Sequence, residues 1–176
     1  MHEACRNWCQ LIKDLYPEYF YDSIVCEMGS LNINGSVRDY FTDCTYIGVD
    51  VIPGPGVNIV SIFHESPLKK ELYDVVTSMN ALEHDIYYEK SLKKMVEILK
   101  PAGLMFISCS GLWKEHGTIN HGANKSGTVK YSEEWSKYYK SLTVNDIVNA
   151  LEPDENFSVW DCALVERDVR FVGIKR

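Results

Sequence analysis

The chain has 176 residues, which is enough for one domain and too few for two full ones. A composition of 45% hydrophobic and 24% charged residues is ordinary for a globular protein and excludes disordered, collagenous and membrane-embedded classes. The net charge of −7 argues against a nucleic-acid partner, since nonspecific nucleic-acid binders are usually basic. We therefore expect a single domain over residues 1–176.

The chain shows no sign of membrane insertion or export. No stretch approaches the roughly 20 apolar residues that span a bilayer, and residues 1–6 lack the basic-then-apolar pattern of a signal peptide. Six cysteines form no CxxC pair and no zinc spacing. Cys5 and Cys9 lie one helical turn apart and hint at a disulfide or metal pair, but reduced thiols are the simpler interpretation. We expect a cytoplasmic protein with no membrane partner and no bound metal.

In chain order, the sequence first predicts an N-terminal helix within residues 1–20. Pro17 ends it, and one of its faces is apolar: Cys5, Trp8, Cys9, Ile12, Leu15 and Tyr16. Five apolar runs then predict strands at 23–27, 46–50, 57–60, 73–78 and 104–109. Helical patterns at 36–41 and 92–99 lie between them, and Thr143 with Asp146 predicts a capping box that opens a helix to Leu151. Runs at 157–165 and 169–174 predict a hairpin.

Strands that alternate with helices predict an α/β fold, a Rossmann-like doubly wound sheet that is mostly parallel and covered on both faces. In such sheets ligands bind beyond the carboxyl ends of the strands. The functional residues are therefore expected in the loops that follow the predicted strands.

Two of these strands end in an acid. Glu27-Met28-Gly29 closes the first, and Asp50, which closes the second, comes 21 residues after Gly29. A carboxylate at about this distance from a strand–glycine turn can accept both hydroxyl protons of an adenosine ribose. The alternative is that Gly29 only makes a turn and Asp50 only caps a strand.

The loop after Glu27 limits the choice of cofactor. Bulky Leu31 and Ile33 interrupt the G-x-G-x-x-G that a dinucleotide pyrophosphate needs, and no P-loop motif occurs in the chain. These absences disfavour an NAD(P) oxidoreductase. S-adenosylmethionine (SAM) offers a ribose and an amino-acid end without phosphates, so it fits better.

At this point the sequence resembles the class I SAM-dependent methyltransferases, and most of all the small methyltransferase type 11 group. The similarity covers about residues 22–110 and rests on four blocks in order: Glu27-Met28-Gly29-Ser30, Tyr46-Ile47-Gly48-Val49-Asp50, Asp74-Val75-Val76-Thr77-Ser78-Met79-Asn80-Ala81-Leu82-Glu83-His84 and Leu99-Lys100-Pro101-Ala102-Gly103-Leu104. The resemblance implies seven strands with an antiparallel C-terminal strand, SAM as cofactor and S-adenosylhomocysteine as product.

The resemblance also implies a cofactor site. It places Glu27, Gly29 and Ser30 by the methionine end, Asp50 on the ribose and Val51 against the adenine. Further expected cofactor contacts are Ile62, Phe63, Ser78, Met79 and Asn80. The family often has an adenine-binding acid at the place where this chain has Ile62.

The acceptor is expected beside the segment after the fifth strand. Residues 110–140 form a long acceptor-side loop or lid, in which His116 is our candidate general base, because imidazole titrates near working pH. Its alternative role is that of a solvated loop histidine. Trp113, His84 and Tyr138 are candidate substrate contacts. Five lysines against three glutamates between residues 113 and 140 favour an acidic acceptor, unless they form a solvated face.

Three functions follow from these observations. The first is methyl transfer to oxygen or nitrogen of a small-molecule or glycan-type acceptor. The second is a methyltransferase-like binding or partner subunit without turnover. The third, an NAD(P) oxidoreductase, is disfavoured. The chain has no extra domain to recognise a large substrate, so a macromolecular acceptor would need a partner or a homodimer to present it.

Overall fold

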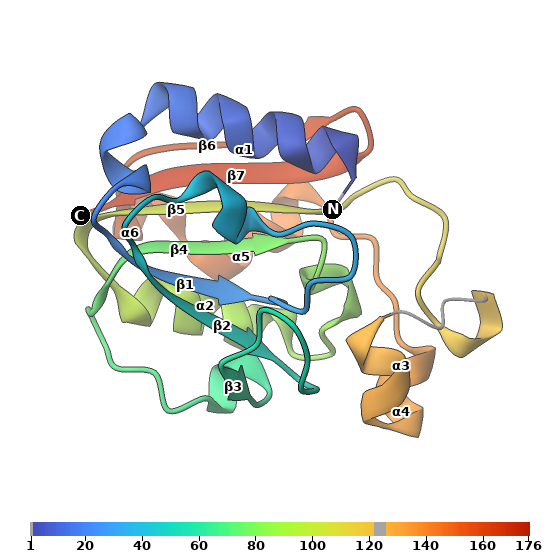
Figure 1. The fold of residues 1–176 in the computed structure, drawn as a ribbon. Helices are drawn as coiled ribbons and strands as arrows, with labels where there is room; N and C mark the ends of the chain where they lie inside the picture. The colour runs from blue at the N-terminus through green and yellow to red at the C-terminus, as the bar shows by residue number, and fades with distance from the viewer. Residues whose placement is uncertain (1, 122–125) are drawn as a thin grey trace.

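The computed structural model describes residues 2–121 and 126–176, which form one seven-stranded sheet in the order β3-β2-β1-β4-β5-β7-β6 (Figure 1). Every neighbouring pair is parallel except the two that involve β7, which is antiparallel to β5 and to β6. The predicted mostly parallel sheet with an antiparallel C-terminal strand is therefore confirmed. The strands are β1 (Ile24–Met28), β2 (Thr45–Asp50), β3 (Ile59–Val60), β4 (Tyr73–Met79), β5 (Leu99–Ser110), β6 (Phe157–Val165) and β7 (Asp168–Lys175).

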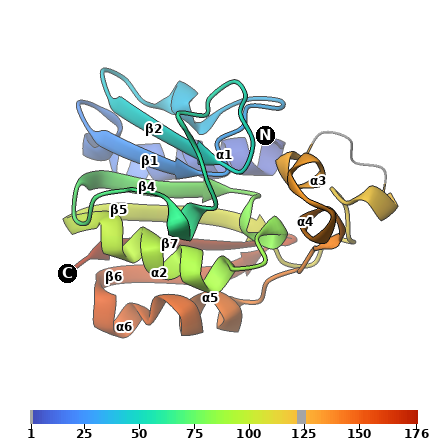
Figure 2. The same cartoon turned by 90° about the horizontal axis from the view of Figure 1, so that it is seen from below.

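Helices cover both faces of the sheet, as a doubly wound fold requires. One face carries α1 (Glu3–Leu15) with the short 3-10 turns η1 (Pro17–Phe20) and η2 (Val37–Tyr40). The other carries α2 (Tyr88–Ile98), α5 (Val144–Leu151) and α6 (Pro153–Asn156) (Figure 2). Two short helices, α3 (Gly127–Tyr131) and α4 (Glu133–Lys137), lie beyond the carboxyl ends of the parallel strands. Three further 3-10 turns, η3 (Phe63–Glu65), η4 (Leu82–His84) and η5 (Ile119–His121), lie in the connections.

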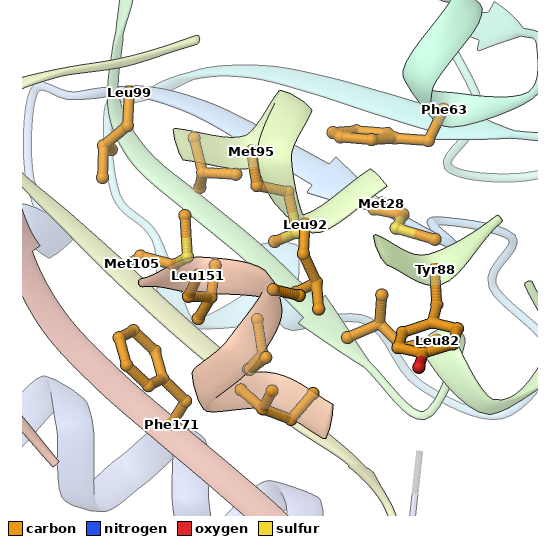
Figure 3. Close-up of a cluster of buried hydrophobic side chains, with 14 of the residues drawn as sticks. Met28, Phe63, Leu82, Tyr88, Leu92, Met95, Leu99, Met105, Leu151 and Phe171 are labelled. Atoms are coloured by element: carbon orange, nitrogen blue, oxygen red, sulfur yellow. The ribbon is translucent and has the colours of Figure 1, made fainter. Parts of the chain in front are cut away.

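The core is split by the sheet into two apolar layers. On the α2 side, Leu92 and Met95 are fully buried against the sheet and α5 (Figure 3). On the α1 side, Ile12 and Cys9 pack on Phe106 of the central strand β5. Each such side chain stabilises the fold by about 1.5–3 kcal/mol. The two layers hold the central strands, and so the loops at their carboxyl ends, in fixed positions.

Several predicted elements differ in detail. Leu15 is 60% exposed, while the buried residues of α1 end at Ile12, so the apolar face predicted for this helix is wrong at Leu15. Residues 36–41 form only the 3-10 turn η2, and the predicted strand 57–60 shrinks to Ile59–Val60. β5 begins earlier than predicted, at Leu99, which pairs with Tyr73. The capping box at Thr143 and the C-terminal hairpin are confirmed.

The segment 110–140, predicted as a loop or lid, contains the short helices η5, α3 and α4, and residues 122–125 lie outside the described part of the chain. Throughout residues 2–121 and 126–176, no helix combines the length and the apolar character needed to cross a membrane.

Candidate active site

A cavity of about 300 Å³ opens at the carboxyl ends of β1, β2 and β4, where the fold predicts a ligand site. It is lined by nine of the residues that the sequence singles out: Glu27, Gly29, Asp50, Val51, Phe63, Met79, Asn80, His84 and His116. The same cavity therefore joins the candidate cofactor residues with the candidate general base.

Glu27 is a deeply buried carboxylate of the cavity. It is the residue before the last of β1, is 5% exposed and accepts a hydrogen bond of 2.8 Å from the phenolic hydroxyl of Tyr46. Burial raises the pKa of Glu27 to about 7, and the hydrogen bond from Tyr46 opposes this rise. A buried acceptor that is close to neutral when empty can become charged when a cationic group binds beside it.

The raised pKa of Glu27 predicts how stability depends on pH. The folded chain binds the Glu27 proton more tightly than the unfolded chain, in which the pKa is 4.5. The contribution of protonated Glu27 to the free energy of unfolding is therefore complete below pH 4.5 and is lost as the pH rises to about 7. In urea unfolding without cofactor, the free energy of unfolding of the wild type should fall by about 3 kcal/mol over this pH range relative to that of Glu27→Gln.

The Tyr46→Phe variant supplies a second test of this account. It removes the Tyr46 hydrogen bond, which lowers the pKa of Glu27. The pKa of Glu27 should therefore rise further, and the pH range over which stability is lost should extend to higher pH. Parallel stability profiles for wild type and Glu27→Gln would contradict the assignment of this pH dependence to Glu27.

Asp50 ends β2 and organises the loop beside it. Its two carboxylate oxygens accept backbone hydrogen bonds from Leu31 at 3.1 Å and Val51 at 2.8 Å. A carboxylate has about four acceptor positions, so both oxygens can still accept ligand hydroxyls. Burial raises the pKa of Asp50, and the backbone hydrogen bonds counteract this rise. The start of α3 lies against the same group, because a Cβ added to Gly127 would stand 2.8 Å from Asp50 Oδ1.

Gly29 lets the β1 loop turn close to the β4 loop. Its φ is +75°, and an added Cβ would clash with the side chain of Ala81. Beyond this turn come Leu31 and Ile33, the bulky residues that interrupt the dinucleotide-binding glycine pattern. Both line the cavity, which remains open beside them.

The charges along the cavity suit a cationic ligand. Three carboxylates line it, those of Glu27, Asp50 and Asp85, while none of the described lining residues is Lys or Arg. A pyrophosphate would meet these carboxylates without a Lys or Arg to balance its charge, whereas the ammonium, sulfonium and hydroxyl groups of SAM would meet groups that favour them. The residues present therefore fit SAM. The lysines at 114, 130, 137 and 140 are absent from the lining, and Lys125 lies outside the described residues.

His84 and His116 line another part of the cavity, and the ring of Tyr139 packs against both of them. His84 and His116 have ring centroids 6.0 Å apart, and the Tyr139 ring lies 5.3 Å and 5.0 Å from them. Nδ1 of His116 is 3.0 Å from the carbonyl oxygen of Lys114. A carbonyl can only accept, so Nδ1 carries a proton, and in the neutral ring Nε2 then has the free lone pair. Burial, assisted by the nearby His116, lowers the pKa of His84 to about 4, so this ring stays neutral.

Five candidate residues lie outside the cavity lining. Ser30 and Ser78 are buried and do not line the cavity. Ile62 does not line it either, although its neighbours Ser61 and Phe63 do. The indole N–H of Trp113 donates to Asp168 at 2.8 Å, so this side chain fastens the segment after β5 to the C-terminal hairpin. Tyr138 is half-buried, and it too is absent from the lining.

The sequence analysis missed one source of lining residues, the start of α1 with His2 and Cys5. The other lining residues near α3 and α4 fall within the predicted acceptor-side segment 110–140: Ser126, Gly127, Thr128 and Trp135. The Cys5 thiol is 2.9 Å from Oδ1 of Asn80 and donates to it. The apolar pattern of α1 shows which face is buried, yet it does not show which end of the sheet the helix begins on, so no local signal pointed to Cys5.

Comparison with known proteins agrees with this geometry. Residues 34–107 match the profile of a family described as "Methyltransferase domain". A search of proteins with curated descriptions found no match. Among solved structures, 1,6-didemethyltoxoflavin-N1-methyltransferase from Burkholderia thailandensis, with bound 1,6-didemethyltoxoflavin and S-adenosylhomocysteine, superposes with a TM-score of 0.67 at 14% identity. The match covers 98% of this chain and 78% of that one.

Two other similar structures share the fold. A SAM-dependent methyltransferase from Aquifex aeolicus has a TM-score of 0.60 at 12% identity, over 93% of this chain and 89% of that one. Phosphoethanolamine N-methyltransferase 2 from Haemonchus contortus, in complex with SAM, has a TM-score of 0.63 at 14% identity. That match covers 96% of this chain but only 52% of the longer protein. Residues 34–107 are therefore similar to a methyltransferase domain, and the chain shares the fold of these SAM-dependent methyltransferases.

Proposed function

We propose that this protein transfers a methyl group from SAM to an oxygen or nitrogen atom of a small-molecule or glycan-type acceptor. The observation that carries the proposal is the single cavity that Glu27, Asp50 and His116 all line. When bound, SAM supplies an electrophilic methyl group. The chain then needs to bind the donor, position the acceptor and accept one proton.

Each of these tasks has a candidate side chain. The carboxylates of Asp50 and Glu27 would accept hydrogen bonds from the ribose hydroxyls and the amino group of the donor. His116 would take the acceptor's proton on Nε2, while the Lys114 carbonyl holds the ring orientation through Nδ1. The rings of His84 and Tyr139 would exclude water beside it. Positioning of this kind supplies much of the rate of an in-line displacement.

The cavity also indicates the charge of the acceptor. With carboxylates and no described Lys or Arg in the lining, an anionic acceptor would find no counter-charge. This favours neutral or cationic hydroxyl and amine compounds over phosphates and carboxylates, contrary to the acidic acceptor suggested by the lysines of residues 113–140.

An acceptor panel tests the proposal. Neutral, cationic and anionic compounds bearing a hydroxyl or amine would be incubated with SAM and the purified protein, with S-adenosylhomocysteine formation as the readout. We expect turnover with members of the first two classes and at least about 10-fold slower turnover with their anionic analogues. A preference for anionic acceptors would contradict the assignment. Donor binding without turnover on any member would favour a binding or partner subunit instead.

A further inference from the structure

Three side chains of metal-binding type meet where His84 and His116 line the cavity. Glu83 and His84 belong to η4, and His116 follows β5. One ligand atom of each lies within 4.8 Å of the others. The proposed methyl transfer leaves Glu83 without a role and uses the ring of His84 only as a wall.

The Glu83 carboxyl is buried without a partner. It is 0% exposed, and neither oxygen has a hydrogen bond. Burial raises the pKa of Glu83. The backbone amides of Glu83 and Ser110 lie near enough to oppose this rise, but neither has the geometry of a hydrogen bond to the carboxyl. An unpartnered buried carboxyl is costly, and proteins normally pair such groups or use them to bind a metal. A cation beside Glu83 would supply the missing partner.

The ring nitrogens of the two histidines can also bind a cation. Nδ1 of His84 is buried and also lacks a hydrogen-bond partner. Nδ1 of His116 is held by the Lys114 carbonyl, so in the neutral ring Nε2 carries the free lone pair. Metal-binding histidines commonly donate their second ring nitrogen to a backbone carbonyl in this way. One nitrogen of each imidazole and one carboxyl oxygen of Glu83 therefore lie within 4.8 Å of one another.

We propose that Glu83, His84 and His116 bind a divalent transition-metal ion. Two imidazoles and a carboxylate form a ligand set that Zn²⁺, Co²⁺ and Fe²⁺ accept, with coordination positions left open toward the cavity. Ligand atoms about 2.1 Å from a tetrahedral ion stand roughly 3.4 Å apart. Closing the observed 4.8 Å requires an inward movement of His116, which lies on irregular backbone between β5 and η5.

The ion has a consequence for catalysis that rests on the proposed function. Metal binding and proton acceptance use the same lone pair on His116 Nε2. A bound ion therefore removes the general base and blocks the acceptor end of the cavity. Zn²⁺ should inhibit methyl transfer, and a chelator should restore it.

Metal binding itself is measured without SAM or acceptor. Zn²⁺ is titrated calorimetrically into chelator-treated full-length protein, and Co²⁺ binding is followed by visible absorption. We expect one ion per chain and at least about 10-fold weaker binding in Glu83→Gln and in His116→Gln. Glu83→Gln keeps the size of the buried side chain, and His116→Gln changes a partly exposed one, so at least the second variant should fold.

The neighbouring His121 supplies the matched control. His121 and Glu115 are exposed and 3.3 Å apart, so they are an alternative surface site on the same segment. His121→Gln should leave Zn²⁺ affinity unchanged. No binding, binding that survives both Glu83→Gln and His116→Gln, or binding lost in His121→Gln would overturn the site. Absence of turnover with Zn²⁺ binding intact would overturn the proposed function and leave the metal site standing.

Discussion

Replacement of Asp50 by asparagine should weaken the binding of S-adenosylhomocysteine at least about 100-fold. Hydrogen bonds to a charged group contribute about 1.5–3 kcal/mol each, and the proposed ribose contact makes two of them. Asparagine keeps the size of the side chain and one acceptor oxygen for the amide of Leu31 or Val51, so the loop should stay close to its present position. Calorimetric titration of the two proteins measures the difference.

The control for this experiment is an acid far from the cavity. Asp161 is exposed on the edge strand β6, and Asp161→Asn makes the same chemical change there. It should leave the affinity unchanged. If Asp50→Asn, shown to be folded by its circular dichroism, binds as tightly as wild type, Asp50 only supports the loop and the ribose is held elsewhere.

The fold was predictable because its signals are local. Apolar runs that end in Glu27 and Asp50 mark buried parallel strands, and the Thr143 capping box marks the start of α5. The predictions that differ from the structure concern strand bounds, which depend on pairing with neighbouring strands. Ile59–Val60 forms only two residues of strand at the sheet edge, and Leu99 joins β5 because it lies opposite Tyr73. The apolar periodicity of the sequence indicates neither of these pairings.

The site was predictable in part, for the same reason. The carboxyl end of a strand is a position that sequence can indicate, so Glu27, Asp50 and Asn80 were found. Cys5 reaches the cavity through the packing of α1, and the sequence does not indicate on which end of the sheet that helix begins. Trp113 stays a prediction. Its place beside the predicted site suggested substrate contact, and in the structure its indole N–H donates to Asp168 while the residue is absent from the cavity lining.

His116→Gln should lower kcat by about 10²–10⁴-fold, the usual contribution of a general base. Glutamine has a similar length, but its amide cannot accept a proton at neutral pH. Because the proposed donor contacts are Glu27 and Asp50 rather than His116, the KM for SAM and the affinity for S-adenosylhomocysteine should change little. Steady-state kinetics with an acceptor from the panel, run with a chelator present, separate loss of the base from metal inhibition.

His121→Gln, on the same segment and exposed, is the matched control and should keep the wild-type kcat. A rise in the KM for the acceptor with unchanged kcat in His116→Gln would mean that His116 binds the acceptor without taking its proton. That outcome would fit an acceptor that needs no deprotonation before attack, because positioning alone can then carry the displacement. Whether the substitution changes kcat or KM therefore decides whether His116, held by the Lys114 carbonyl, acts as a general base or only lines the cavity.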